Sequence, residues 1–152
     1  MIRSRRWAAV SAAVVLGLAL TGCAGMNEQD VSDRLVEATS LNGAIVEVQH
    51  PGAPWVNQIM IRMFVEDGSA DAVAEDVREV AAFAVEDSDL EGEPLMFLAV
   101  EGSPDDFDDP VLATIVGSLR VMGSVSEALG AGHGVEEILE LSANDVRVVA
   151  AG

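Results

Sequence analysis

The chain has 152 residues, enough for one hydrophobic core and too few for two ordinary domains. Half of the residues are hydrophobic but only six are aromatic, which predicts a core of mainly aliphatic side chains. With 26 acidic residues, eight arginines and no lysine, the net charge of −18 disfavours binding to the phosphates of a nucleic acid.

The first 22 residues differ in charge from the rest of the chain. Residues 1–6 hold three arginines, and no acidic residue occurs before Glu28. Residues 7–20 form an apolar run interrupted only by Ser11, which is shorter than the ~20 residues that a helix needs to cross a bilayer. A positive start followed by a short apolar run is typical of a cleaved export signal. We therefore expect residues 1–22 to be a signal peptide.

The apolar run ends in Leu20-Thr21-Gly22-Cys23, and Cys23 is the only cysteine. This stretch resembles the lipobox of bacterial lipoproteins, in which an aliphatic residue, a small residue and Gly or Ala precede an obligatory cysteine. The resemblance implies cleavage between Gly22 and Cys23 by a lipoprotein signal peptidase, and a diacylglyceryl group on the Cys23 sulfur. Two or three acyl chains give a stable anchor. The implied location is the exported face of a cell membrane, with the lipid as the link between protein and membrane.

One alternative for Cys23 is an ordinary cysteine, in an uncleaved segment inserted in the membrane or in an ordinary secretory signal. A single cysteine in an exported protein has no partner for an internal disulfide. Acylation explains why just one cysteine is present.

Residues 23–41 are polar and acidic, and we expect them to form the acylated amino terminus and a flexible tether. Val31, Leu35 and Ala38 lie at helical spacing, which favours a frayed helix within this tether. Residues 42–152 are then expected to form a single domain.

Two strands joined by a turn are predicted to begin this domain. Residues 43–49 are rich in β-branched side chains, and residues 50–54 (HPGAP) contain the proline and glycine typical of a turn. Residues 55–66 alternate in polarity, as a strand does. The side chains expected on one face are Ile59, Ile61, Met63 and Val65, opposite Gln58, Arg62 and Glu66. With Asn57, Arg62 is expected to mark a solvated face of the sheet that is available to a partner.

A helix and a third strand are predicted next. Ser69 is the expected N-cap of the helix, and Asp71 is favourable in its first turn. The apolar residues that share one helical face are Val73, Val77, Val80, Ala81 and Ala84. Residues 95–100 (LMFLAV) form a continuous apolar run, which is typical of a strand covered on its faces.

A second helix is expected to begin with Asp109 as N-cap and Pro110 as its first residue. Its apolar side would consist of Leu112, Ile115, Val116, Leu119 and Met122. Gly123 would end or kink this helix, and the capping-box spacing of Ser124 and Glu127 favours a further turn that ends near residue 129.

The rest of the chain completes the predicted fold. After a glycine-rich loop at residues 130–134, residues 138–141 fit either a strand or a helix, and residues 146–150 are predicted to be a final strand. Right-handed crossovers place both helices on the same face. The sequence therefore predicts an α+β two-layer sandwich, with a four- or five-stranded, mostly antiparallel sheet and two helices on one face.

The serine, histidine and acidic side chains do not form a recognisable catalytic pattern. A serine nucleophile would need a histidine base, and no Gly-x-Ser-x-Gly motif is present. His50 and His133 lie far apart in sequence, without metal-ligand spacing near either. The carboxylates of residues 105–109 are suited to Ca²⁺, but they lack the EF-hand spacing, and we expect a solvated loop whose last residue caps a helix. We therefore expect no enzyme, no cofactor and no metal site.

The expected function is that of a membrane-anchored exported lipoprotein with a small acidic, non-catalytic accessory or interaction domain of the cell envelope. Its expected partners are the membrane, through the lipid, and an unidentified envelope protein. The alternative is a lipoprotein that binds a small ligand, either an apolar molecule or a cation. Candidates for lining an apolar pocket are Trp55, Met60, Met63 and Met96. Strand alternation explains Met63 equally well as a core residue.

Overall fold

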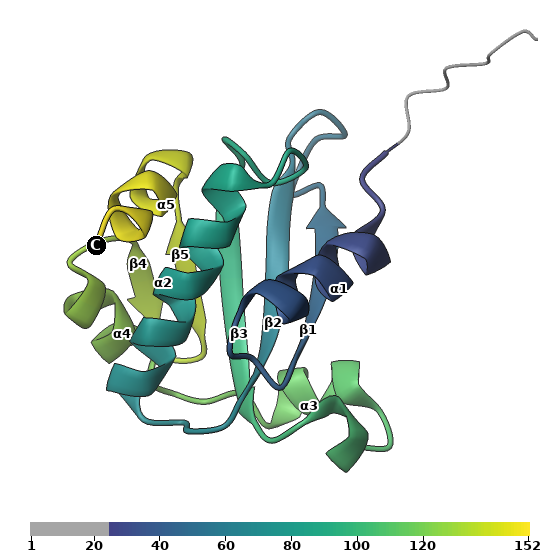
Figure 1. Ribbon diagram of the computed structural model, residues 1–152, viewed down its shortest axis with the longest axis vertical. Coiled ribbons are helices and arrows are strands. Elements are labelled where there is room, and N and C mark those ends of the chain that lie inside the picture. Colours follow the sequence, from purple (N-terminus) through teal and green to yellow (C-terminus); the bar gives the residue numbers. More distant parts are fainter. Residues whose placement is uncertain (1–24) are drawn as a thin grey trace, which may run out of the picture.

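The computed structural model describes residues 25–152, so the predicted signal peptide, Gly22 and Cys23 lie outside the described residues. The described residues form a five-stranded sheet and five α-helices (Figure 1). In chain order the elements are α1 (Glu28–Ala38), β1 (Gly43–Gln49), β2 (Gln58–Val65), α2 (Ala70–Glu86), β3 (Leu95–Glu101), the 3-10 turn η1 (Pro104–Asp106), α3 (Pro110–Val116), α4 (Met122–Leu129), β4 (His133–Val135), β5 (Ile138–Leu141) and α5 (Ala143–Ala150).

The sheet has the strand order β1-β2-β3-β5-β4. Strands β2 and β3 are parallel and are joined through α2, whereas the other three neighbouring pairs are antiparallel. The prediction of an α+β fold with a mostly antiparallel sheet is confirmed. The segment at residues 138–141, which the sequence left open, is strand β5.

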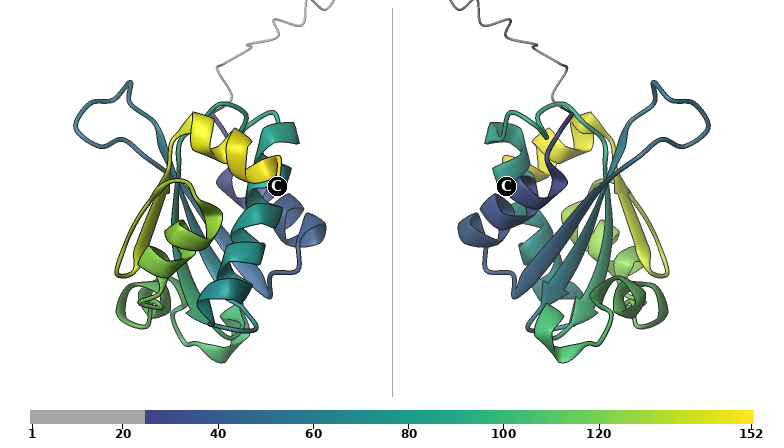
Figure 2. Two further views of the ribbon diagram at one scale, coloured as in Figure 1. Left: turned by 90° about the vertical axis from the view of Figure 1, so that its left-hand side faces the viewer. Right: turned by 90° about the vertical axis from the view of Figure 1, so that its right-hand side faces the viewer.

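The core lies between the sheet and the helices α1, α2 and α5, which cover the same face (Figure 2). The predicted inward face of β2 is confirmed, because Ile59, Ile61, Met63 and Val65 are all buried. They meet the apolar face of α2, whose N-cap Ser69 accepts a hydrogen bond from the Ala72 amide, as expected. Helix α4 adds Met122 and Val125 to the same core.

Part of the segment expected to be a tether is a packed helix. Helix α1 begins after Asn27, whose side chain accepts a hydrogen bond from the Asp30 amide. Of the three residues predicted at helical spacing, Val31 and Leu35 are completely buried against the core, whereas Ala38 is exposed. From Glu28 onward, the chain is therefore fixed to the sheet.

The second predicted helix is two helices on different sides of the sheet. Asp109 and Pro110 begin α3 as expected, and the Asp109 carboxylate accepts a hydrogen bond from the Leu112 amide at 2.9 Å. The helix then ends at Val116, because the chain crosses the end of the sheet, where the Leu119 amide donates to the Ala99 carbonyl at 2.8 Å. A continuous helix would not leave that amide free to bond with β3.

The predicted final strand at residues 146–150 is wrong, because these residues belong to α5. The helix begins with a capping box, in which Ser142 and Asp145 each accept a hydrogen bond from the backbone amide of the other. Val146 and Val149 are buried in the core that α5 shares with α2. The cap and this packing outweigh the preference of valine for strands.

Candidate functional site

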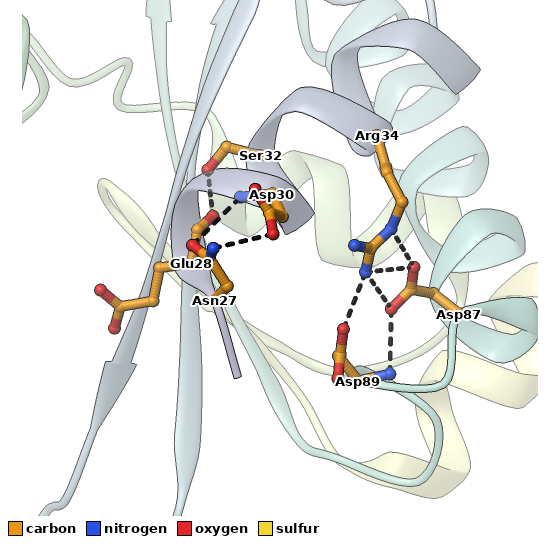
Figure 3. Close-up of polar contacts among 7 residues, drawn as sticks. All are labelled: Asn27, Glu28, Asp30, Ser32, Arg34, Asp87 and Asp89. Atoms are coloured by element: carbon orange, nitrogen blue, oxygen red, sulfur yellow. Dashed lines mark hydrogen bonds and ion pairs between the residues drawn. The ribbon is translucent and has the colours of Figure 1, made fainter. Parts of the chain in front are cut away.

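Two side chains of helix α1, Glu28 and Ser32, bond to the outer edge of the sheet. Figure 3 shows both residues and the bond from the Ser32 hydroxyl to the Glu28 carbonyl. The Ser32 hydroxyl donates to the Glu28 carbonyl and accepts from the Val46 amide at 2.9 Å. The Glu28 carboxylate accepts from the Val48 amide at 2.6 Å. These amides belong to β1, an edge strand, whose outward N–H groups would otherwise be open to another chain. The two bonds therefore fix the first helical turn on the sheet.

Arg34 joins α1 to the end of α2 (Figure 3). Its Nε donates to Asp87, the C-cap of α2, at 3.0 Å, and its Nη2 donates to Asp89 at 2.8 Å. The hydrogen bonds to Asp87 and then to Asp89 raise the pKa of the Arg34 guanidinium above its ordinary value. The place where the chain enters the fold is thus set by contacts to both the sheet and α2.

The loop between β1 and β2, residues 50–57, starts and ends beside this entry point. Its first and last residues, His50 and Asn57, line a hollow of about 380 Å³ together with Gly25. Within the loop, the Val56 amide donates to the Ala53 carbonyl at 3.0 Å, which closes a β-turn with Pro54 at its second position.

Trp55 stands at the tip of this loop and is 83% exposed. The strand predicted from residue 55 begins instead at Gln58, because the Pro54 turn extends as far as Val56. The four candidate pocket residues are consequently dispersed. Met63 faces the core and is fully buried, whereas Met60 and Met96 are register neighbours on the opposite sheet face.

Helix α3 presents its apolar side to solvent. We call the residues Val111, Leu112, Ile115 and Val116 the α3 patch. Leu112, Ile115 and Val116 are 51%, 60% and 77% exposed, and the only buried residues of α3 are Ala113 and Thr114. The prediction that Leu112, Ile115, Val116, Leu119 and Met122 form one side of a single helix is wrong, because α3 ends at Val116 and Met122 is buried in α4. The short helix α3 rests on its small residues.

Arg62 is buried beneath α3, and the expectation of a solvated sheet face at this residue is wrong. The residue is 7% exposed, and its guanidinium donates to Glu47 at 2.9 Å and to the Thr114 hydroxyl at 3.0 Å. Asn57, the other residue expected on that face, is exposed in the loop that precedes β2. Arg62 therefore holds α3 against the sheet.

The acidic residues near η1 surround a second hollow of about 440 Å³. Its lining residues are Asn42, Glu66, Glu101, Gly102, Ser103 and Asp106. Glu101 accepts a hydrogen bond from the Gly68 amide at 3.0 Å, and Asp106 accepts one from the Ser103 amide at 2.7 Å. These carboxylates cap backbone amides, which is a structural task.

The two histidines belong to opposite edges of the sheet, with His50 directly after β1 and His133 at the start of β4. Between residues 25 and 152, no group of three or more His, Cys, Asp and Glu side chains is placed to hold a metal ion. Within that same range, no helix combines the length and apolar character that a membrane crossing requires.

Two features of these surfaces have no counterpart in the sequence expectations. Neither the exposed α3 patch nor the exposed tip at Trp55 follows from residue spacing, although the Ala-Pro before Trp55 would have supported a longer turn.

No protein-family model, curated protein or solved structure matches the chain.

Proposed function

We propose that the chain is a membrane-anchored exported lipoprotein, whose small acidic domain is a non-catalytic interaction module of the cell envelope. The anchoring part is supported by the lipobox resemblance of Leu20-Thr21-Gly22-Cys23 at the end of a short apolar run. The non-catalytic part is supported by the positions of His50 and His133 on opposite edges of the sheet, where neither can assist the other.

The observation that carries the interaction role is the α3 patch. It gathers four aliphatic side chains on one short helix, in a chain whose net charge is −18. Contiguous exposed apolar surface is typical of a protein–protein contact. Helix α3 lies at the end of the fold opposite to the point where the described chain begins (Figure 1). A partner that binds there would not compete with the anchor for space.

The anchoring part is tested by the intact mass of the protein extracted from membranes. We expect the loss of residues 1–22 and the addition of acyl chains on a chain that begins at Cys23. The variant Cys23→Ala should accumulate as the unprocessed precursor. An unmodified Cys23 in protein extracted from membranes would contradict the proposal.

The interaction role is tested by photo-cross-linking in cells. A photoreactive amino acid at position 115 should give a discrete adduct, and the same residue at position 148 serves as the matched control. Both positions carry exposed aliphatic side chains, and Val148 belongs to α5, which lies at the opposite end of the fold from α3 (Figure 1). The adduct at position 115 should disappear when Leu112→Ser is added. An adduct pattern that is equal at the two positions would contradict a partner specific for α3.

A further inference from the structure

We propose that the loop at residues 50–57 touches the surface of the bilayer that carries the anchor, with Trp55 placed in the lipid headgroup region. This inference rests on the proposed lipid anchor at Cys23 and adds a second, protein-made contact with the same membrane. The occupant of the loop surface is a lipid bilayer.

The first argument is the position of the anchor. Cys23 precedes Gly25 by two peptide units, which span at most about 7.6 Å between Cα atoms. Gly25 lines the same hollow as His50 and Asn57, the two ends of the loop. A bilayer that holds the acyl chains of Cys23 must therefore lie close to the base of this loop.

The second argument is the direction of the loop. It projects beyond the sheet at the end of the molecule where the described chain begins (Figures 1 and 2). The Ala53–Val56 turn holds the tip in a defined shape, so Trp55 is presented by an ordered structure. Its exposed fraction of 83% means that most of the residue is open to solvent.

The third argument is chemical. The segment 50–61 contains no acidic residue and no arginine, in a chain with 26 acidic residues. Tryptophan favours the boundary between membrane and water, because its ring is apolar and its N–H can still donate to a polar group. An uncharged tip with one tryptophan is thus suited to a headgroup layer.

The surrounding charges limit how deep this contact can go. Glu28, Asp89 and Glu93 line the hollow at the base of the loop. Carboxylates do not enter hydrocarbon and are repelled by anionic headgroups. We therefore expect Trp55 to reach the headgroup region while the base of the loop stays in water, and we expect anionic lipid to weaken the contact.

The experiment uses the fluorescence of the acylated protein in vesicles. The chain has two tryptophans, Trp7 and Trp55, and cleavage before Cys23 removes Trp7, so the mature protein reports on Trp55 alone. The protein is purified from membranes and placed in phosphatidylcholine vesicles, with or without brominated lipid. We expect the Trp55 emission to lie at a shorter wavelength than that of a tryptophan in water and to be quenched by the brominated lipid. The quenching should be weaker when phosphatidylglycerol is added.

The matched control is the double variant Trp55→Phe with Ile115→Trp, which moves the only tryptophan of the mature protein to the exposed α3 patch. Its emission should not respond to brominated lipid. If the wild-type protein carries acyl chains and sediments with the vesicles but Trp55 is not quenched, the loop contact is refuted and the anchor stands. If the intact mass shows no acyl chain on Cys23, both proposals fall together.

Discussion

Helices α1 and α3 show that the average polarity of a segment does not decide whether it is buried. Helix α1 lies in a polar, acidic stretch, yet its few apolar residues are buried and its polar residues bond to the edge of the sheet. Helix α3 lies in an apolar stretch, yet it exposes most of its aliphatic side chains. What matters is the direction in which each side chain points once the ends of the helix are fixed.

The largest expected effect is a difference in stability between the alanine variants of two leucines, one in α1 and one in α3. Leu35→Ala in α1 should lower the free energy of unfolding by about 2–5 kcal/mol, because it leaves a cavity in the core. Leu112→Ala in α3 should change it by no more than about 0.5 kcal/mol, since half of that residue is in water. Urea unfolding measures both values. Equal losses for the two variants would contradict the comparison.

The contact between α1 and the Val46 amide of the β1 edge depends on one oxygen atom, that of the Ser32 hydroxyl. Ser32→Ala removes the acceptor of the buried Val46 amide and should cost about 1–3 kcal/mol of unfolding free energy. Hydrogen exchange at the Val46 amide should become faster. The control is Ser88→Ala, an exposed serine without a comparable role, which should have little effect on either measurement. Unchanged exchange at Val46 in the Ser32 variant would show that α1 does not protect this edge.

The attachment of α3 depends on Thr114. Thr114→Val removes an acceptor from the buried guanidinium of Arg62, and we expect a loss of about 1–3 kcal/mol in unfolding free energy. Thr39→Val is the matched control, because the Thr39 hydroxyl only donates to the Leu35 carbonyl in the preceding turn. If the two variants lose the same stability, the bond to Arg62 does not hold α3 in place.

The smallest effect concerns the end of α1 and depends on pH. Burial raises the pKa of the Asp76 carboxyl above 3.8, partly offset by a hydrogen bond from the Ser40 hydroxyl at 3.2 Å, while the charge of Glu79 raises it further. Because the folded-state pKa exceeds the unfolded one, the charged form of Asp76 destabilises the fold above that raised pKa. The destabilisation fades as the pH falls toward 3.8.

Asp76→Asn should therefore raise the unfolding free energy at neutral pH and lose this advantage in acid. Urea unfolding at two pH values measures the difference. Asp105→Asn, in the exposed η1 turn, is the control and should show no such pH-dependent gain. A gain for Asp76→Asn that grows as the pH falls would contradict the raised pKa.

The parts of the fold that follow from the sequence are those governed by local periodicity. The alternation of Ile59, Ile61, Met63 and Val65 fixes the inward face of β2, and the Ser69 cap marks the start of α2. The break between α3 and α4 was not predictable in the same way. It depends on where β5 stops pairing with β3, because only then is the Ala99 carbonyl free to accept from Leu119.

The candidate surfaces were less predictable than the fold. The seal by Glu28 and Ser32 depends on the register between α1 and β1, which sequence spacing alone does not specify. Because residues 55–66 alternate in polarity, the strand was predicted to begin at residue 55, whereas β2 begins at Gln58. The exposed position of Trp55 in the preceding loop was therefore not predicted. The anchor at Cys23, in contrast, was predicted from a local motif, and it stays a prediction.

Because α1 begins at Glu28, the folded domain of the proposed lipoprotein must stay close to its lipid anchor. Glu28, the first helical residue, lies five peptide units after Cys23, and five extended residues reach at most about 18 Å. A domain attached through so short a linker would not reach a surface on the far side of an envelope compartment. Its binding partners would have to be neighbours in the same lipid leaflet, or proteins that come down to it.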